Sequence, residues 1–257
     1  MSRTRMVWSK GHKALPKTEW LLEAVPGVGN VGKLLVDSLV DAYENELVVK
    51  ILHPDLPPHA TLDSEGYLIP PSLNIHKITL PKGGSILTLS SNFQPITPAG
   101  QHEVASVLLE ACKSAGVGRV LILAGLAAEP GDAAVHLVCP SAEDRAAMEK
   151  LGLVTSTKHP SAGIIGLTGM VASLAPTFGQ PAICAVAETV GTSVDVVAAD
   201  RLAKWIDESF KLGLALALDS TESTAEKLRS FFELEEVAEL DAMFGPEGEG
   251  ESEAFYA

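Results

Sequence analysis

The sequence contains few cysteines and few aromatic residues, and it has no excess of basic charge. Its three cysteines, Cys112, Cys139 and Cys184, lie far apart and predict neither a disulfide framework nor a Cys-x-x-Cys metal site. The first 20 residues lack an apolar run of the length that a signal peptide needs. The expected compartment is therefore a reducing cytoplasm.

Long hydrophobic runs are also missing. The most apolar region, residues 159–187, carries no Asp, Glu, Lys or Arg, but Pro160, Pro176 and Pro181 divide it. The pieces are shorter than the ~20 residues that a membrane-spanning helix requires. They predict a buried helix followed by a buried strand, and no membrane partner is expected.

No pattern of catalytic or metal-binding residues is present. None of the seven histidines belongs to a helical i, i+4 pair or to an H-E-x-x-H sequence, and no Ser or Cys lies in G-x-S-x-G. We therefore expect no metal, no cofactor and no catalytic residue.

The formal net charge is −14, and most of it comes from one end of the chain. Residues 219–257 hold twelve acidic and two basic side chains. Nucleic acids are bound mainly through Lys and Arg that neutralise phosphate, so a nucleic-acid partner is not expected. The acidic segment is either a solvated charged surface or an acidic docking surface.

The 257 residues, 46% of them hydrophobic, suit one large domain or two small ones. Strands are predicted at residues 20–25, 47–52, 66–69, 73–80, 85–90, 119–124, 135–139 and 182–186. Helices are predicted at residues 31–42, 98–115, 141–152, 163–174, 194–218 and 224–244. Alternating strands and helices favour an α/β layer structure, in which the continuously apolar strand 119–124 is internal.

Local signals mark several helix ends. Asn30, Thr97 and Ser141 stand at predicted N-caps, Pro98 suits a first helical position, and Gly116 can end its helix in a left-handed turn.

The stretch Gly27-Val-Gly-Asn-Val-Gly32 matches the G-x-G-x-x-G pattern of dinucleotide sites and lies between a predicted strand and helix. Asp55 stands near the position of a ribose-binding acid, although His53 and Pro54 separate it from the strand. The alternative is that Gly27, Gly29 and Gly32 permit a sharp turn and close helix packing. A P-loop is excluded, because Leu34 occupies the Ser or Thr position.

The last three residues differ from the segment before them. Residues 245–254 contain three glycines, one proline and four glutamates, a composition that predicts disorder. Phe255-Tyr256-Ala257 then places two aromatic residues and a terminal carboxylate at the end of this acidic tether. Tyrosine offers a large contact surface with one hydroxyl, and the carboxylate can pair with a lysine of a partner.

Five motifs, in this order, resemble those of the proteasome assembly chaperone family, in its archaeal branch related to the second eukaryotic assembly chaperone subunit. They are Pro26-Gly-Val-Gly-Asn-Val-Gly-Lys33, Asp55-Leu-Pro-Pro58, Gln94-Pro-Ile-Thr-Pro-Ala-Gly-Gln101, Gly163-Ile-Ile-Gly-Leu-Thr-Gly169 and Glu188-Thr189. The resemblance spans residues 18–218.

The resemblance implies a three-layer α/β fold with a mixed, largely parallel sheet, similar to nucleoside phosphorylases. It also implies self-association and no established catalysis. In some archaeal members a C-terminal hydrophobic-Tyr-any tripeptide docks between α-subunits of the proteasome core particle, which here corresponds to Phe255, Tyr256 and Ala257.

The predicted organisation is an N-terminal extension (1–17), the α/β domain (18–218), an acidic helix (219–244) and a flexible acidic tail (245–257). The expected function is that of a non-enzymatic assembly chaperone or activator. Its expected partners are the α-subunit ring of the core particle, further copies of itself and a possible paralogous chaperone. Two alternatives remain: a nucleotide- or nucleoside-binding α/β enzyme using Gly27, Gly29 and Gly32, and a structural interaction protein with an incidental tail.

Overall fold

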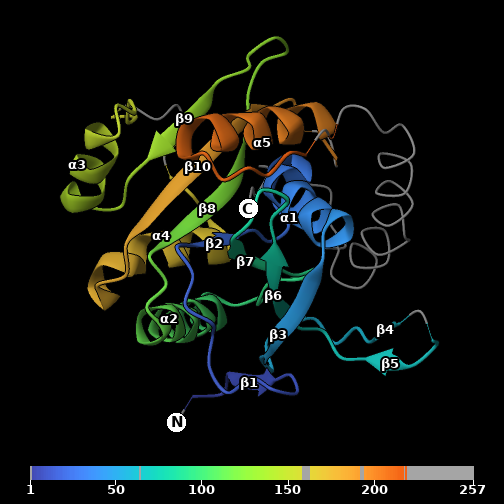
Figure 1. The fold of residues 1–257 in the computed structure, drawn as a ribbon. Helices are drawn as coiled ribbons and strands as arrows, with labels where there is room; N and C mark the ends of the chain where they lie inside the picture. The colour runs from blue at the N-terminus through green and yellow to red at the C-terminus, as the bar shows by residue number, and fades with distance from the viewer. Residues whose placement is uncertain (1, 64, 158–162, 192–193, 217, 219–257) are drawn as a thin grey trace.

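A mixed eight-stranded sheet forms the middle layer of the protein (Figure 1). The computed structural model describes residues 2–63, 65–157, 163–191, 194–216 and 218. The strands are β1 (Arg5–Trp8), β2 (Trp20–Glu23), β3 (Asn45–Leu52), β4 (Thr61–Leu62), β5 (Leu68–Ile69), β6 (Leu73–Thr79), β7 (Ser85–Ser90), β8 (Arg119–Ala127), β9 (Val135–Val138) and β10 (Ala182–Thr189). The helices are the 3-10 turn η1 (Val28–Asn30), α1 (Val31–Ala42), α2 (Pro98–Ala115), α3 (Ala142–Lys150), α4 (Gly166–Phe178) and α5 (Val196–Phe210).

The strand order is β1-β3-β6-β7-β2-β8-β10-β9, and the four neighbours β7, β2, β8 and β10 are parallel. The outer pairs are antiparallel. Strands β4 and β5 form a separate hairpin that projects from the body (Figure 1). The expected α/β fold with a mixed sheet is confirmed, and β2 and β3 lie in the same sheet with β6 and β7 between them.

Helices cover both faces of the sheet. Helices α1 and α5 lie on one face, and α2 and α4 lie on the other (Figure 1). The side chains of β8 alternate accordingly: Val120 and Ile122 join the core under α2 and α4, whereas Leu121 and Leu123 join the core under α1 and α5. Strands buried on both faces read as continuous apolar runs, which explains the sequence of β8.

Helix α2 begins as its local sequence predicts. The Thr97 hydroxyl accepts a hydrogen bond from the Gly100 amide at 3.1 Å, and Pro98 occupies the first helical position. The same hydroxyl donates to Asp55 Oδ2 at 2.6 Å. At the other end, Gly116 adopts a left-handed conformation with φ 72°. Helix α3 is capped in the same way by Ser141.

Replacing Thr97 by alanine will lower the free energy of unfolding by about 1 kcal/mol, because the helix loses its N-cap acceptor. Urea unfolding measures this change. The control is Thr97→Ser, which keeps the hydroxyl and should recover most of the loss. Equal stabilities of Thr97→Ala and the parent protein would show that Thr97 does not stabilise α2 as its N-cap.

The predicted helix 194–218 is too long. Helix α5 ends at Phe210, and Lys211 adopts a left-handed conformation with φ 54°. The Asp207 carboxylate accepts hydrogen bonds from the amides of Gly213 and Leu214, which holds the chain in this turn. The cause is a local capping interaction that the spacing of apolar residues does not reveal.

Residues 211–216 and Leu218 run back along the body. The Tyr43 hydroxyl donates to the Leu214 carbonyl at 2.6 Å, and the Leu218 amide donates to Asp200 Oδ1 at 3.2 Å. Leu214 and Leu218 are buried in the core under α1 and α5. The body of the protein is therefore held together as far as Leu218.

The predicted helix 163–174 is shifted along the chain. Helix α4 begins at Gly166 and runs through Pro176 to Phe178. Pro176 stands in the last turn, where its missing N–H removes a single hydrogen bond, and Gly179 ends the helix with φ 62°.

Part of residues 1–17, expected as an N-terminal extension, belongs to the sheet, because β1 pairs antiparallel with β3. Glu103 on α2 binds the segment before β1: its Oε1 accepts hydrogen bonds from Ser2 Oγ and from the Thr4 amide. These hydrogen bonds hold the pKa of Glu103 well below its usual range. The predicted helix 224–244 and tail 245–257 lie outside the described residues.

Candidate functional site

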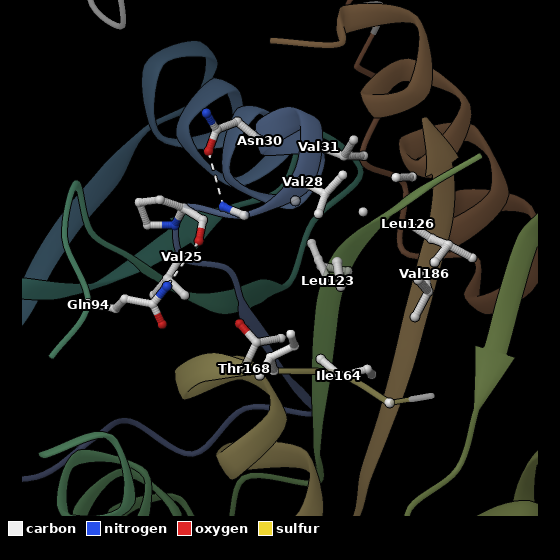
Figure 2. Close-up of a pocket in the computed structure, with 18 residues that line it drawn as sticks. Val25, Val28, Asn30, Val31, Gln94, Leu123, Leu126, Ile164, Thr168 and Val186 are labelled. Carbon is white, nitrogen blue, oxygen red and sulfur yellow. Dashed lines mark hydrogen bonds between the residues drawn. The ribbon is translucent and has the colours of Figure 1, made fainter. Parts of the chain in front are cut away.

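A pocket of about 340 Å³ opens where the parallel strands β2, β8 and β10 reach their carboxyl ends. Residues 25–32 form one wall, residues 123–127 the middle, and residues 163–165 with Thr168 the opposite wall. Figure 2 shows Val28 and Val31 facing Ile164 and Thr168 across the pocket, with Leu123 between them. This end of an open α/β sheet is where such folds commonly place ligands.

The glycine motif forms the first wall, and close packing explains two of its glycines. Gly29 has φ +63°, and a Cβ there would lie 2.6 Å from Thr189 Oγ1. Gly32 stands in the first turn of α1, where a Cβ would lie 2.7 Å from both Cβ and the carbonyl oxygen of Leu123. Helix α1 therefore packs directly on the backbone of β8, in agreement with the shape interpretation.

Asn30 occupies the predicted N-cap position of α1, but it does not cap that helix. Its backbone is left-handed with φ 47°, and no side-chain bond to the helix amides forms. Its Oδ1 instead accepts a hydrogen bond from the Gly27 amide at 3.3 Å, drawn as the dashed line in Figure 2. The Asn30 side chain thus stabilises the turn formed by residues 27–30.

The surroundings of the turn differ from those of a phosphate site. No Lys, Arg or His belongs to the pocket lining in the described part of the chain. Lys33 is buried and pairs with Asp37 one turn along α1. Asp55, the candidate ribose-binding acid, is not a lining residue, and its Oδ2 accepts from the amide and hydroxyl of Thr97. The described lining therefore offers no cationic side chain to neutralise a phosphate.

Two polar side chains of the pocket were not predicted. Gln94 Oε1 accepts from the Leu167 amide at 3.0 Å, and its Nε2 donates to the Pro26 carbonyl at 3.4 Å. Gln94 therefore joins the glycine turn to the start of α4, so that three of the five motifs are hydrogen-bonded to one another here. Thr168, on the first turns of α4, is 8% exposed and lines the opposite wall.

Glu23 lies fully buried beside this wall. Thr168 Oγ1 is 3.4 Å from Glu23 Oε1, and Glu23 Oε2 has no hydrogen-bond partner within the part of the chain that the structure describes. Burial raises the pKa of Glu23 to about 8, against the Thr168 hydrogen bond, which lowers it. Burial therefore favours the neutral carboxylic acid of Glu23 over its carboxylate. The run Trp20-Leu-Leu-Glu23 gives no local signal for this.

The Glu188-Thr189 motif connects β10 to its neighbours. Glu188 Oε1 lies 3.0 Å from His136 Nε2, and Oε2 accepts from the Ala134 amide at 2.8 Å. The hydrogen bond with His136 is the main cause that lowers the pKa of Glu188. The Thr189 hydroxyl donates to Asp195 Oδ2 at 2.6 Å, next to Gly29. These hydrogen bonds hold the carboxyl end of β10 to the β9 region and to the start of α5.

The described residues contain no cluster of three or more His, Cys, Asp or Glu side chains that could hold a metal ion. Burial raises the pKa of the Cys112 thiol to about 12, which makes it a poor nucleophile. No helix among these residues has the length and apolar character needed to cross a membrane. Phe255, Tyr256 and Ala257 lie outside the described residues.

The fold and the pocket define a three-layer α/β protein with an apolar site at the carboxyl edge of its sheet. Comparison with known proteins then gives the family: the model of the PAC2 family matches residues 21–237, and the chain belongs to this family. The resemblance to proteasome assembly chaperones is thereby confirmed.

Individual relatives are distant. The uncharacterized protein MJ1210 of Methanocaldococcus jannaschii is 24% identical over 221 residues, which cover 83% of this chain and 81% of that protein. Pyrococcus furiosus PbaB, an archaeal proteasome activator, matches in structure with a TM-score of 0.73 and 17% identity, over 93% of this chain and 100% of that one. Pyrococcus furiosus PbaA, an archaeal homolog of proteasome-assembly chaperone, gives a TM-score of 0.69 and 24% identity, over 92% and 99%. These structures share the fold.

Proposed function

We propose that this protein is a non-enzymatic proteasome assembly chaperone or activator, which binds the α-subunit ring of the core particle through Phe255, Tyr256 and Ala257. Membership of the PAC2 family carries the proposal. The C-terminal sequence supports it, because an acidic tether of low apolar content ends in two aromatic residues.

The body provides a defined origin for the tether. The chain is bonded to the body at Leu214 and Leu218 through Tyr43 and Asp200. With residues 224–244 helical as predicted and the other 18 residues of 219–257 extended, this segment could span about 95 Å, so the last three residues can reach a partner well beyond the body.

Self-association would strengthen this binding. A single three-residue anchor binds weakly, but several tails on one oligomer engage together and raise avidity by ~10²-fold or more. We therefore propose that the protein acts as a homo-oligomer in the cytoplasm. Light scattering after size exclusion gives the oligomeric state directly.

Removing residues 255–257 will reduce capture of purified core particle at least tenfold, because the anchor is lost. Pull-down or surface plasmon resonance with the full-length chain and the truncation measures the difference. The control is Ser252→Ala, which changes the tether and leaves the anchor intact. Undiminished binding by the truncation would refute the role of the tail.

Two further variants separate the parts of the anchor. Tyr256→Phe removes one hydroxyl and should weaken binding less than Tyr256→Ala. Adding Gly-Ser-Gly after Ala257 moves the terminal carboxylate and should weaken binding as strongly as truncation, if that carboxylate pairs with a lysine of the partner. Hydrolysis of a fluorogenic peptide by core particle, with and without the protein, distinguishes an activator from an assembly chaperone.

A further inference from the structure

The pocket at the carboxyl ends of β2, β8 and β10 has the size of a small-molecule site. Its volume of about 340 Å³ falls at the lower end of the ~300–1,000 Å³ that such sites occupy. Its wall is firmly held, since Leu123 is 2% exposed and Val186 1% exposed within neighbouring parallel strands. The cavity is therefore part of the folded body.

The chemistry of the wall is predominantly apolar. Val28, Val31, Leu123, Ile164 and Val186 face the space from four separate segments of the chain (Figure 2). The amide of Gln94 is already engaged at both ends, by the Leu167 amide and the Pro26 carbonyl. A ligand would thus meet mostly hydrocarbon.

Thr168 supplies the polar exception. Its hydroxyl lines the pocket and lies 3.4 Å from the buried Glu23, whose second oxygen has no partner in the described ranges. The Thr168 O–H donates to Glu23 Oε1, which leaves Thr168 Oγ1 able to accept a hydrogen bond from a ligand. Thr168 thus offers one uncharged hydrogen-bond acceptor to the pocket.

We propose that this pocket binds an uncharged, predominantly apolar small molecule that presents a single polar group to Thr168. The apolar wall favours this class of ligand, and the described lining residues include no Lys, Arg or His to receive an anion and no Asp or Glu to receive a cation. The proposal is independent of the proposed docking of the C-terminal tail.

A pair of probes tests the proposal. N-phenyl-1-naphthylamine is uncharged, and 8-anilinonaphthalene-1-sulfonate has the same ring system with an added sulfonate. Fluorescence titration of the full-length protein should show saturable binding of the uncharged probe at one site per chain. The sulfonate should bind at least tenfold more weakly, because no cation among the described lining residues compensates its desolvation. Equal affinities, or no saturable binding of the uncharged probe, would overturn the proposal.

Variants locate the binding. Leu126→Trp places a larger side chain at the pocket wall and should weaken binding of the uncharged probe at least tenfold. The matched control is Val197→Trp, which adds the same ring at a position 69% exposed and outside the lining, and should leave binding unchanged. If Leu126→Trp does not fold, Val28→Phe adds bulk on the wall formed by residues 25–32 instead. Unchanged binding in folded wall variants would refute the assignment.

The polar group is tested separately. Thr168→Val removes the hydroxyl at nearly constant volume and should weaken the uncharged probe by about threefold to tenfold, since its amine hydrogen bonds with Thr168. Thr168→Ser keeps the hydroxyl and should restore most of the affinity. Equal affinities of the Val and Ser variants for the uncharged probe would show that the Thr168 hydroxyl does not take part in binding.

Discussion

Replacing Gly32 by alanine will destabilise the protein by about 2 to 3 kcal/mol, although alanine is normally the better helix residue. Gly32 stands in the first turn of α1, and a Cβ would lie 2.7 Å from the Leu123 carbonyl oxygen. That oxygen belongs to the backbone of β8, so it cannot move aside as a flexible side chain would. The helix must lift away from the sheet.

Urea unfolding with circular dichroism measures the loss. The matched control is Gly163→Ala, because a Cβ at Gly163 meets no atom of the described residues within 4 Å and its φ is not positive. That variant should not be destabilised, and it should gain at most about 1 kcal/mol from the lower entropy of its unfolded chain. If Gly32→Ala were as stable as the parent protein, the packing of α1 would not depend on this close approach. The nucleotide-binding interpretation of the motif would then have to be reconsidered.

Replacing Glu23 by glutamine will stabilise the protein at pH 8 and leave its stability nearly unchanged at pH 4. Burial raises the pKa of Glu23 from 4.5 to about 8 in the folded state. Between these values the unfolded chain releases its proton and the folded chain keeps it, so stability falls as the pH rises. The resulting loss in the free energy of unfolding is absent below pH 4.5 and complete above pH 8. It amounts to at most about 5 kcal/mol.

Glutamine has nearly the same shape and no charge to desolvate, so the variant should lose this pH dependence. Thermal unfolding at pH 4, 6 and 8 should show its Tm about 10 °C above that of the parent at pH 8. The control Glu65→Gln changes an exposed carboxylate and should preserve the slope of the parent. Parallel pH profiles of parent and Glu23→Gln would contradict a neutral buried Glu23.

Features that depend on neighbouring residues could be predicted from the sequence. Thr97 and Pro98 mark the start of α2, Gly116 marks its end, and the apolar run of β8 marks an internal strand. Each of these signals is contained within a few residues. The family could be predicted because several short motifs occur together in order, although none is specific alone.

Features that depend on distant segments could not be predicted. The pocket combines residues 25–32, Gln94, residues 123–127 and residues 163–168, which come together only through the order of the strands. The environment of Glu23 has the same origin, because α4 covers it from far along the chain. The predicted length of α5 was wrong because Asp207 accepts hydrogen bonds from two amides beyond the end of the helix. The spacing of apolar residues does not reveal this interaction.

The attachment of the chain at Leu218 has a consequence for how this protein can vary. Because the hydrogen bonds of Tyr43 and Asp200 hold the polypeptide just before the acidic segment, the described body extends past the end of α5 as far as Leu218. A cut after Phe210 would remove Leu214 and Leu218 from the core and weaken it, whereas a junction after Leu218 would keep both residues. Any exchange of the acidic segment for a tail of another length, charge or terminal sequence would therefore have to retain residues 211–218.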